Sequence, residues 1–129
     1  MPYQSDIQVV DGYVRAEVTG ARIPATAKSD HLDTFKKIRD VVRRANTKRL
    51  LLVSKLTGPL APMLVFDFTN DPEKIGWSRN QSVALVGLSE SARDALEMIE
   101  LLAVNRDMPV KLFDDENSAI AWLNQQPGG

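Results

Sequence analysis

Two apolar runs constrain the fold of this chain more than any other feature. Residues 50–53 and 83–86 are apolar throughout and lack the alternation of a half-buried strand. Strands of this kind are typical of a parallel sheet that is covered on both faces. Around these runs, apolar residues recur at helical spacing over residues 32–45 and 92–103. The sequence therefore predicts strands and helices in alternation.

A hairpin is expected at the N-terminal end. Residues 7–10 form a short apolar run, Asp11 and Gly12 follow, and residues 13–18 alternate between apolar and polar. An Asp-Gly pair between two strands is a strong hairpin signal, because both turn positions favour a positive φ. We expect two antiparallel strands with one face more exposed to solvent than the other.

The remaining segments complete an α/β architecture. A second helix is expected from the prolines at 59 and 62 to Phe68, and a short strand at 110–113 precedes a final helix. The order β-β-α-β-α-β-α-β-α predicts a mixed five-stranded sheet with helices packed against it. Residues 1–129 are expected to form a single domain with a loose tail at 126–129. The crossovers between parallel strands should be right-handed, but the pattern carries no signal for strand order.

Composition excludes several kinds of chemistry. The chain has no cysteine and one histidine, so zinc–sulfur sites, iron–sulfur clusters and multi-histidine metal sites are not expected. Glycine-rich dinucleotide and phosphate-loop motifs are also absent from the sequence. We therefore assign no metal, no cofactor and no catalytic residue, and we do not expect an enzyme. A net charge of −1 argues against a nucleic-acid partner.

Targeting and membrane signals are not found in the sequence. No apolar run approaches the ~18 residues of a membrane-spanning helix. The first residues carry neither a basic start nor an apolar stretch, so they do not read as a signal peptide. A cytoplasmic location is expected.

Two features invite a catalytic interpretation that the sequence does not favour. Residues 87–91 resemble the nucleophile elbow of hydrolases, but Ser91 stands where the strained turn needs its second glycine. The only histidine, His31, comes too early in the chain for the triad order. Ser89 is better interpreted as a helix cap, and His31 as a neutral histidine on the surface.

The first helix carries an uneven charge. Residues 36–49 hold seven basic side chains against Asp40 alone. One interpretation is a docking face for an acidic partner or an anionic membrane surface. The interpretation that we favour is a solvated helix face with i,i+4 ion pairs, namely Asp33–Lys37, Lys36–Asp40 and Asp40–Arg44.

The segment 59–77 has more apolar side chains than one helix face needs. Ordinary core, a homodimer seam and the wall of an apolar pocket are the three uses that compete. The leading hypothesis is that the protein carries or senses a small apolar molecule, with this helix as a movable wall. The candidate lining residues are Met63, Leu64, Phe66, Phe68 and Trp77. A homodimer is also expected.

From Ser82 onward the sequence resembles the SpoIIAA-like family, small bacterial proteins grouped with STAS and CRAL-TRIO domains. The resemblance is carried by the strand at 83–87, Arg93, residues 103–106, the strand at 110–113 with Asp114, and the ending Ala119 … Trp122-Leu123. The resemblance implies a SpoIIAA-like (STAS-like) fold for the whole chain.

The resemblance implies two functions. STAS domains that antagonise anti-sigma factors carry a phosphorylatable serine in an Asp-Ser-Gly-like motif at the start of the second helix. The corresponding stretch here is 54–59, in which only Thr57-Gly58 echoes that pattern. The alternative hypothesis is therefore a partner-switching regulator whose site is Ser54, Thr57 and Gly58, with the basic first helix as docking face. The CRAL-TRIO side implies a lipophilic ligand between the sheet and a mobile helix.

Overall fold

Five strands form one mixed sheet in the order β1-β2-β3-β4-β5. The computed structural model describes residues 3–60 and 62–127, without the side chains of residues 62–64, 69 and 75. β1 pairs antiparallel with β2, and β3, β4 and β5 continue the sheet in parallel. The strands are β1 (Gln4–Val10), β2 (Tyr13–Ala21), β3 (Arg49–Thr57), β4 (Ser82–Gly87) and β5 (Val110–Phe113). The predicted element order and the mixed sheet are confirmed.

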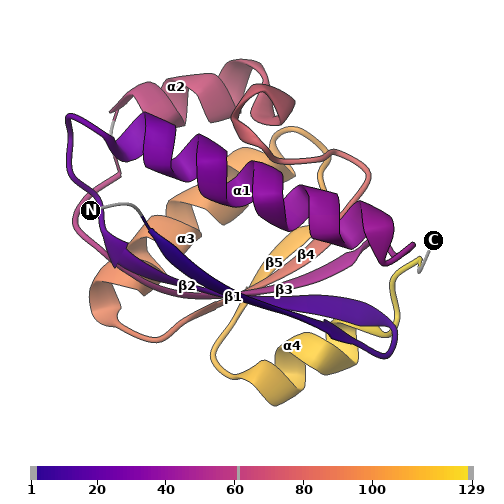
Figure 1. The fold of residues 1–129 in the computed structure, drawn as a ribbon. Helices are drawn as coiled ribbons and strands as arrows, with labels where there is room; N and C mark the ends of the chain where they lie inside the picture. Colours follow the sequence, from indigo (N-terminus) through magenta and orange to yellow (C-terminus); the bar gives the residue numbers. More distant parts are fainter. Residues whose placement is uncertain (1–2, 61, 128–129) are drawn as a thin grey trace.

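Three helices cover one face of the sheet and the fourth covers the other (Figure 1). The three are α1 (Ala27–Arg44), α2 (Pro62–Asn70) and α3 (Glu90–Val104), and the fourth is α4 (Glu116–Leu123). A short 3-10 helix, η1 (Pro72–Ile75), follows α2. Each parallel crossover moves one strand further in the same direction, so right-handed connections place their helices on the same side. In the described residues no strand follows α4, and this helix packs on the opposite face of the sheet.

The two faces of the sheet bury cores of unequal size. The larger core lies under α1, α2 and α3 and includes Val18, Leu52, Leu85, Ile38 and Leu96. The smaller core lies under α4 and consists of Leu51, Val53, Ala84, Val86, Ala119 and Leu123. Strands β3 and β4 therefore contribute buried side chains to both faces, as their continuous apolar runs predict.

The N-terminal hairpin has the expected register but a different turn. Val10 pairs with Tyr13 across a two-residue connection, as predicted. Gly12 has a φ of +91°, whereas Asp11 is not among the described residues with a positive φ. The expectation that both turn residues adopt positive φ is therefore wrong, because Gly12 alone supplies the left-handed conformation.

The C-terminal end is held to the sheet by Arg49. The guanidinium donates to the carbonyl oxygen of Gln126 from Nε (3.0 Å) and Nη2 (2.5 Å), and to that of Asn124 from Nη2 (3.3 Å). The chain is thus anchored as far as residue 126, and residues 128–129 of the expected tail lie outside the described residues.

Gly87 allows α3 to begin directly against the end of β4. A Cβ at this position would lie 2.8 Å from both the Cα and the backbone nitrogen of Arg93. We expect Gly87→Ala to lower the free energy of unfolding by about 1–3 kcal/mol, because a rigid backbone has to move. Urea denaturation measures the loss. The control is Leu88→Ala at the neighbouring, half-exposed position, where a change of about 0.5 kcal/mol or less is expected. Equal losses in the two variants would contradict the steric explanation.

Candidate functional site

Three loops meet at the edge of the sheet where the parallel strands β3, β4 and β5 end. Because these strands are neighbours, the segments that follow them lie side by side. The backbone N–H of Leu88 donates to the carbonyl oxygen of Ser54 at 3.0 Å. The guanidinium of Arg93 lies 3.7 Å from the carboxylate of Asp114, joining the start of α3 to the loop after β5. The arrangement expected of ligand- or partner-binding loops in such sheets is therefore present.

Hydrogen bonds from the buried residue Arg22 hold the β3–α2 loop in place. The guanidinium of this buried residue donates to the carbonyl oxygen of Gly58 at 2.7 Å, and its backbone N–H donates to that of Thr57 at 2.9 Å. Burial lowers the pKa of Arg22. Gly58 has a φ of +86°, and a Cβ there would lie 3.1 Å from the Arg22 carbonyl oxygen. The loop thus has a fixed starting conformation that depends on a glycine.

An open groove of about 420 Å³ runs between this loop, α2 and α3. Its lining is mainly apolar, with Asp94 and Ser91 as polar members, and consists of Gly58, Pro59, Leu60, Val65, Ser91, Asp94, Ala95 and Met98. Met98 is 43% exposed, and Leu101 and Val104 continue an exposed apolar row along α3 at a spacing of three residues. Apolar side chains grouped on a surface beside a groove are typical of an interaction site.

An aromatic cluster beneath α2 includes the only histidine. His31 stacks on Phe35 with ring centroids 4.2 Å apart, and Phe68 meets Trp77 edge to face at 5.3 Å. The indole Nε1–H of Trp77 donates to Nε2 of His31 at 2.9 Å. Burial lowers the pKa of His31 to about 3, and the positive charge of Arg22 acts in the same direction. His31 is neutral as expected, but the prediction of a surface position is wrong because the indole supplies a buried hydrogen-bond partner.

The residues predicted to line an apolar pocket do not share one environment. Phe68 and Trp77 are 3% exposed and belong to the core, whereas Phe66 is 61% exposed. The side chains of Met63 and Leu64 lie outside the described residues. The cavity in the core beside His31 and Phe35 has a volume of about 10 Å³, which is the room of one water molecule. The carrier interpretation stays a prediction.

Of the three residues predicted to form a regulatory site, Ser54 and Thr57 lie on opposite faces of β3, and Gly58 directly follows the strand. Ser54 is 2% exposed, lines the small core cavity, and accepts a hydrogen bond from the backbone N–H of Leu56 at 3.2 Å. Thr57 is exposed, and its hydroxyl donates to the carbonyl oxygen of Gly20 at 3.4 Å. Of the two hydroxyls, that of Thr57 is the one an enzyme can reach in the folded protein.

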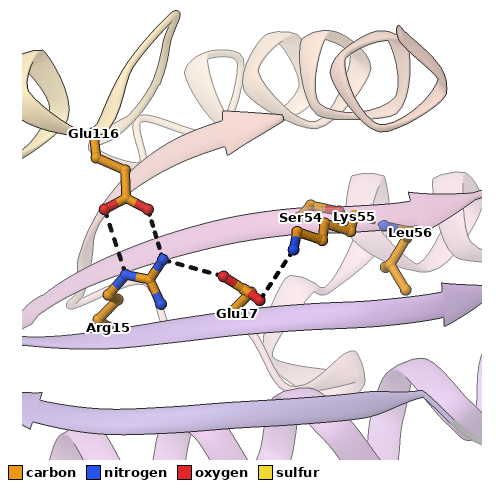
Figure 2. Close-up of polar contacts among 6 residues, drawn as sticks. All are labelled: Arg15, Glu17, Ser54, Lys55, Leu56 and Glu116. Carbon is orange, nitrogen blue, oxygen red and sulfur yellow. Dashed lines mark hydrogen bonds and ion pairs between the residues drawn. The ribbon is translucent and has the colours of Figure 1, made fainter. Parts of the chain in front are cut away.

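A row of alternating charges crosses the face of the sheet that α4 covers (Figure 2). Arg15 Nη2 lies 2.6 Å from Glu116 and 3.2 Å from Glu17, and Lys55 Nζ lies 3.5 Å from the other oxygen of Glu17. The hydrogen bond from Arg15 lowers the pKa of Glu17. The row connects α4, β2 and β3, and it ends two residues before Thr57 on the same face of β3.

The basic helix α1 does not form the pairs that we expected. Within residues 3–60 and 62–127, none of the i,i+4 pairs along this helix comes within ion-pair distance. Instead, Lys28 pairs with Asp67 of α2 at 3.1 Å, and Arg39 donates to the carbonyl oxygen of Glu73 at 3.2 Å. Lys28 and Arg39 of α1 therefore contact neighbouring elements, and the other basic side chains of this helix are exposed to solvent.

Neither a metal-binding cluster nor a membrane span is found in the described part of the chain. No group of three His, Cys, Asp or Glu side chains there could hold a metal ion. No helix there is both long and apolar enough to cross a membrane.

Comparison with known proteins identifies the fold. A crystal structure of an anti-sigma factor antagonist from Mycobacterium paratuberculosis is similar with a TM-score of 0.59 at 15% identity, and the match covers 95% of each chain. No protein-family model matches the sequence, and a search of curated proteins found no match. The predicted STAS-like fold is confirmed.

The buried state of His31 makes stability dependent on pH. The unfolded chain takes up a proton on its histidine below about pH 6.5, whereas the folded protein resists this until about pH 3. The free energy of unfolding should therefore fall as pH decreases through this window, by about 1.4 kcal/mol per pH unit from this group. Urea denaturation at pH 7 and pH 5 should show a loss about 2 kcal/mol larger for the wild type than for His31→Gln. The same pH dependence in both proteins would contradict the assignment.

Proposed function

We propose that this protein is a non-catalytic regulator that acts by binding a partner protein, and that the partner is an anti-sigma factor. The fold shared with an anti-sigma factor antagonist supports this class of function over the carrier of a lipophilic molecule. The carrier and homodimer interpretations stay predictions. The observation that carries the proposal is the open groove beside the β3–α2 loop, since it offers a surface that a protein can occupy.

The chemistry of the groove indicates how the partner is held. Met98 and the exposed apolar row on α3 supply area whose burial favours association. Acidic side chains flank this row, because α3 carries Glu90, Asp94 and Glu97 on exposed positions. A partner that fits places an apolar side chain in the groove and basic residues at its margin. Arg22 keeps the adjoining loop in place, so that little conformational entropy is lost on binding.

The first test of this proposal is a binding measurement on a pair of matched variants. Isothermal titration calorimetry of the purified protein with the anti-sigma factors of its own organism should detect binding. Met98→Glu places a charge in the groove and should raise the Kd at least 10-fold, about 1.4 kcal/mol. Val9→Glu changes an equally apolar, exposed side chain on the edge strand β1 and should leave the Kd within about twofold. An absence of binding by the wild type, or equal losses in both variants, would overturn the proposal.

We further propose Thr57 as the residue through which phosphorylation controls binding. Its exposed hydroxyl lies at the start of the loop that borders the groove. A phosphate there adds between one and two negative charges and would compete with Glu17 for the ammonium group of Lys55. The chain lacks the Asp-Ser-Gly pattern of the family at this point, so the proposal is carried by accessibility and place.

The phosphorylation proposal is tested by intact-mass spectrometry of protein isolated from cells. We expect a form heavier by one phosphate, which disappears in Thr57→Ala and persists in Ser54→Ala because Ser54 is buried. A phosphate that persists in Thr57→Ala, or the absence of any phosphorylated form under all growth conditions, would count against this role.

A further inference from the structure

A second pocket lies at the opposite end of the sheet from the groove. It has a volume of about 370 Å³ and is lined by Arg43, Asn46, Thr47, Lys48, Ser78, Asn80 and Gln81. Lys48 directly precedes β3 and Gln81 directly precedes β4, whereas the groove borders residues that follow β3. Because β3 and β4 are parallel neighbours, the pocket lies where these strands begin and the groove lies at the opposite end of the sheet, where they finish. The pocket is therefore separate from the proposed partner-binding site.

The charged side chains of this pocket are both cations. Arg43 comes from the last turn of α1, and Lys48 comes from the connection into β3. None of the seven lining residues is a carboxylate. Neither cation takes part in an ion pair within the described ranges 3–60 and 62–127. The pocket thus presents positive charge that the described part of the protein does not neutralise.

The neutral side chains of the pocket include an unused hydrogen-bonding group. Gln81 is 6% exposed and lines the pocket, and its backbone N–H donates to the carbonyl oxygen of Ser78 at 3.3 Å. Ser78 is equally buried, and its hydroxyl oxygen accepts from the backbone N–H of Asn80 at 3.3 Å, so its O–H remains available to donate. A hydroxyl that lines a pocket and keeps its O–H unused is a donor that a ligand oxygen can accept from.

The end of helix α1 is arranged so that it opposes an anion only weakly. A helix C-terminus carries partial negative charge on its last carbonyl groups. Here Asn46 has a φ of +57°, and its backbone N–H donates to the carbonyl oxygen of Arg43. The backbone N–H of Thr47 donates to the carbonyl oxygen of Val42. These bonds engage the terminal carbonyls. The Thr47 hydroxyl donates to the carbonyl oxygen of Gly12 and accepts from the backbone N–H of Arg49. It therefore holds the loop in place and is not available to a ligand.

We propose that this pocket binds a small phosphate monoester. A guanidinium offers paired N–H donors, an ammonium offers a compact charge, and the two together are typical of phosphate recognition. The hydroxyl of Ser78 and the amides of Asn46, Asn80 and Gln81 supply further donors for phosphate oxygens or for hydroxyl groups of the ester. The volume is large enough for a phosphorylated sugar. This site goes beyond the proposed regulatory function and does not depend on it.

The test is a titration followed by NMR at 0.15 M salt, with ribose 5-phosphate as the probe, inorganic phosphate as the minimal ligand and ribose as the control. We expect saturable shifts of the backbone amides of Lys48, Asn80 and Gln81 with both phosphates and none with ribose. Shifts with ribose alone, or no saturable shift with any probe, would overturn the proposal.

Matched variants separate a built site from diffuse attraction. Arg43→Gln and Lys48→Gln should each weaken ribose 5-phosphate binding at least 10-fold. Arg44→Gln removes an equally basic, exposed side chain of the same helix that does not line the pocket, and it should change the affinity less than twofold. Because all three side chains are exposed, the variants are expected to fold. An equal loss in Arg44→Gln would show attraction to the basic helix in general and would overturn the pocket.

Discussion

Burial of β3 and β4 on both faces is the constraint on which the rest of this structure depends. Side chains on one face of these strands require the layer of α1, α2 and α3, and those on the other face require α4. Leaving either face in water would expose a row of Leu, Val and Ala side chains and lose roughly 25 cal/mol for each Å² of apolar surface. The helices thus close the faces of the sheet, and its ends remain open for loops (Figure 1). Both proposed sites lie at these ends.

Polar groups within the larger core connect these layers to the groove. Arg22 and Ser54 line the same small cavity as His31, and each makes a contact that fixes a neighbouring segment. A buried cation with neutral partners is costly to stability, and the pKa of Arg22 is lowered accordingly. The contact it makes holds the β3–α2 loop at the edge of the groove. The same residue therefore joins core stability to the shape of the proposed binding surface.

The candidate site could be predicted in part. The convergence of the loops after β3, β4 and β5 follows from local patterns and from the parallel arrangement. The side chains of α2 that would line an apolar pocket could not be predicted in the same way, because this helix is apolar on nearly every side. Phe66 and Phe68 are two positions apart, about 200° around a helix, so they face opposite directions. Arg22 and the His31–Trp77 pair carry no local signal, since their partners lie 36 and 46 residues away.

The sequence by itself determined the elements, their order and the strands that are covered on both sides, because periodicity and turn residues act over a few neighbouring positions. Only the tertiary structure decided the order of the strands and hence the face on which each helix packs. It also decided which polar side chains meet in the core and which cations remain without a carboxylate. These features depend on contacts between distant segments, and such contacts exist only when the chain has closed into its layers. The groove and the basic pocket both belong to this second class.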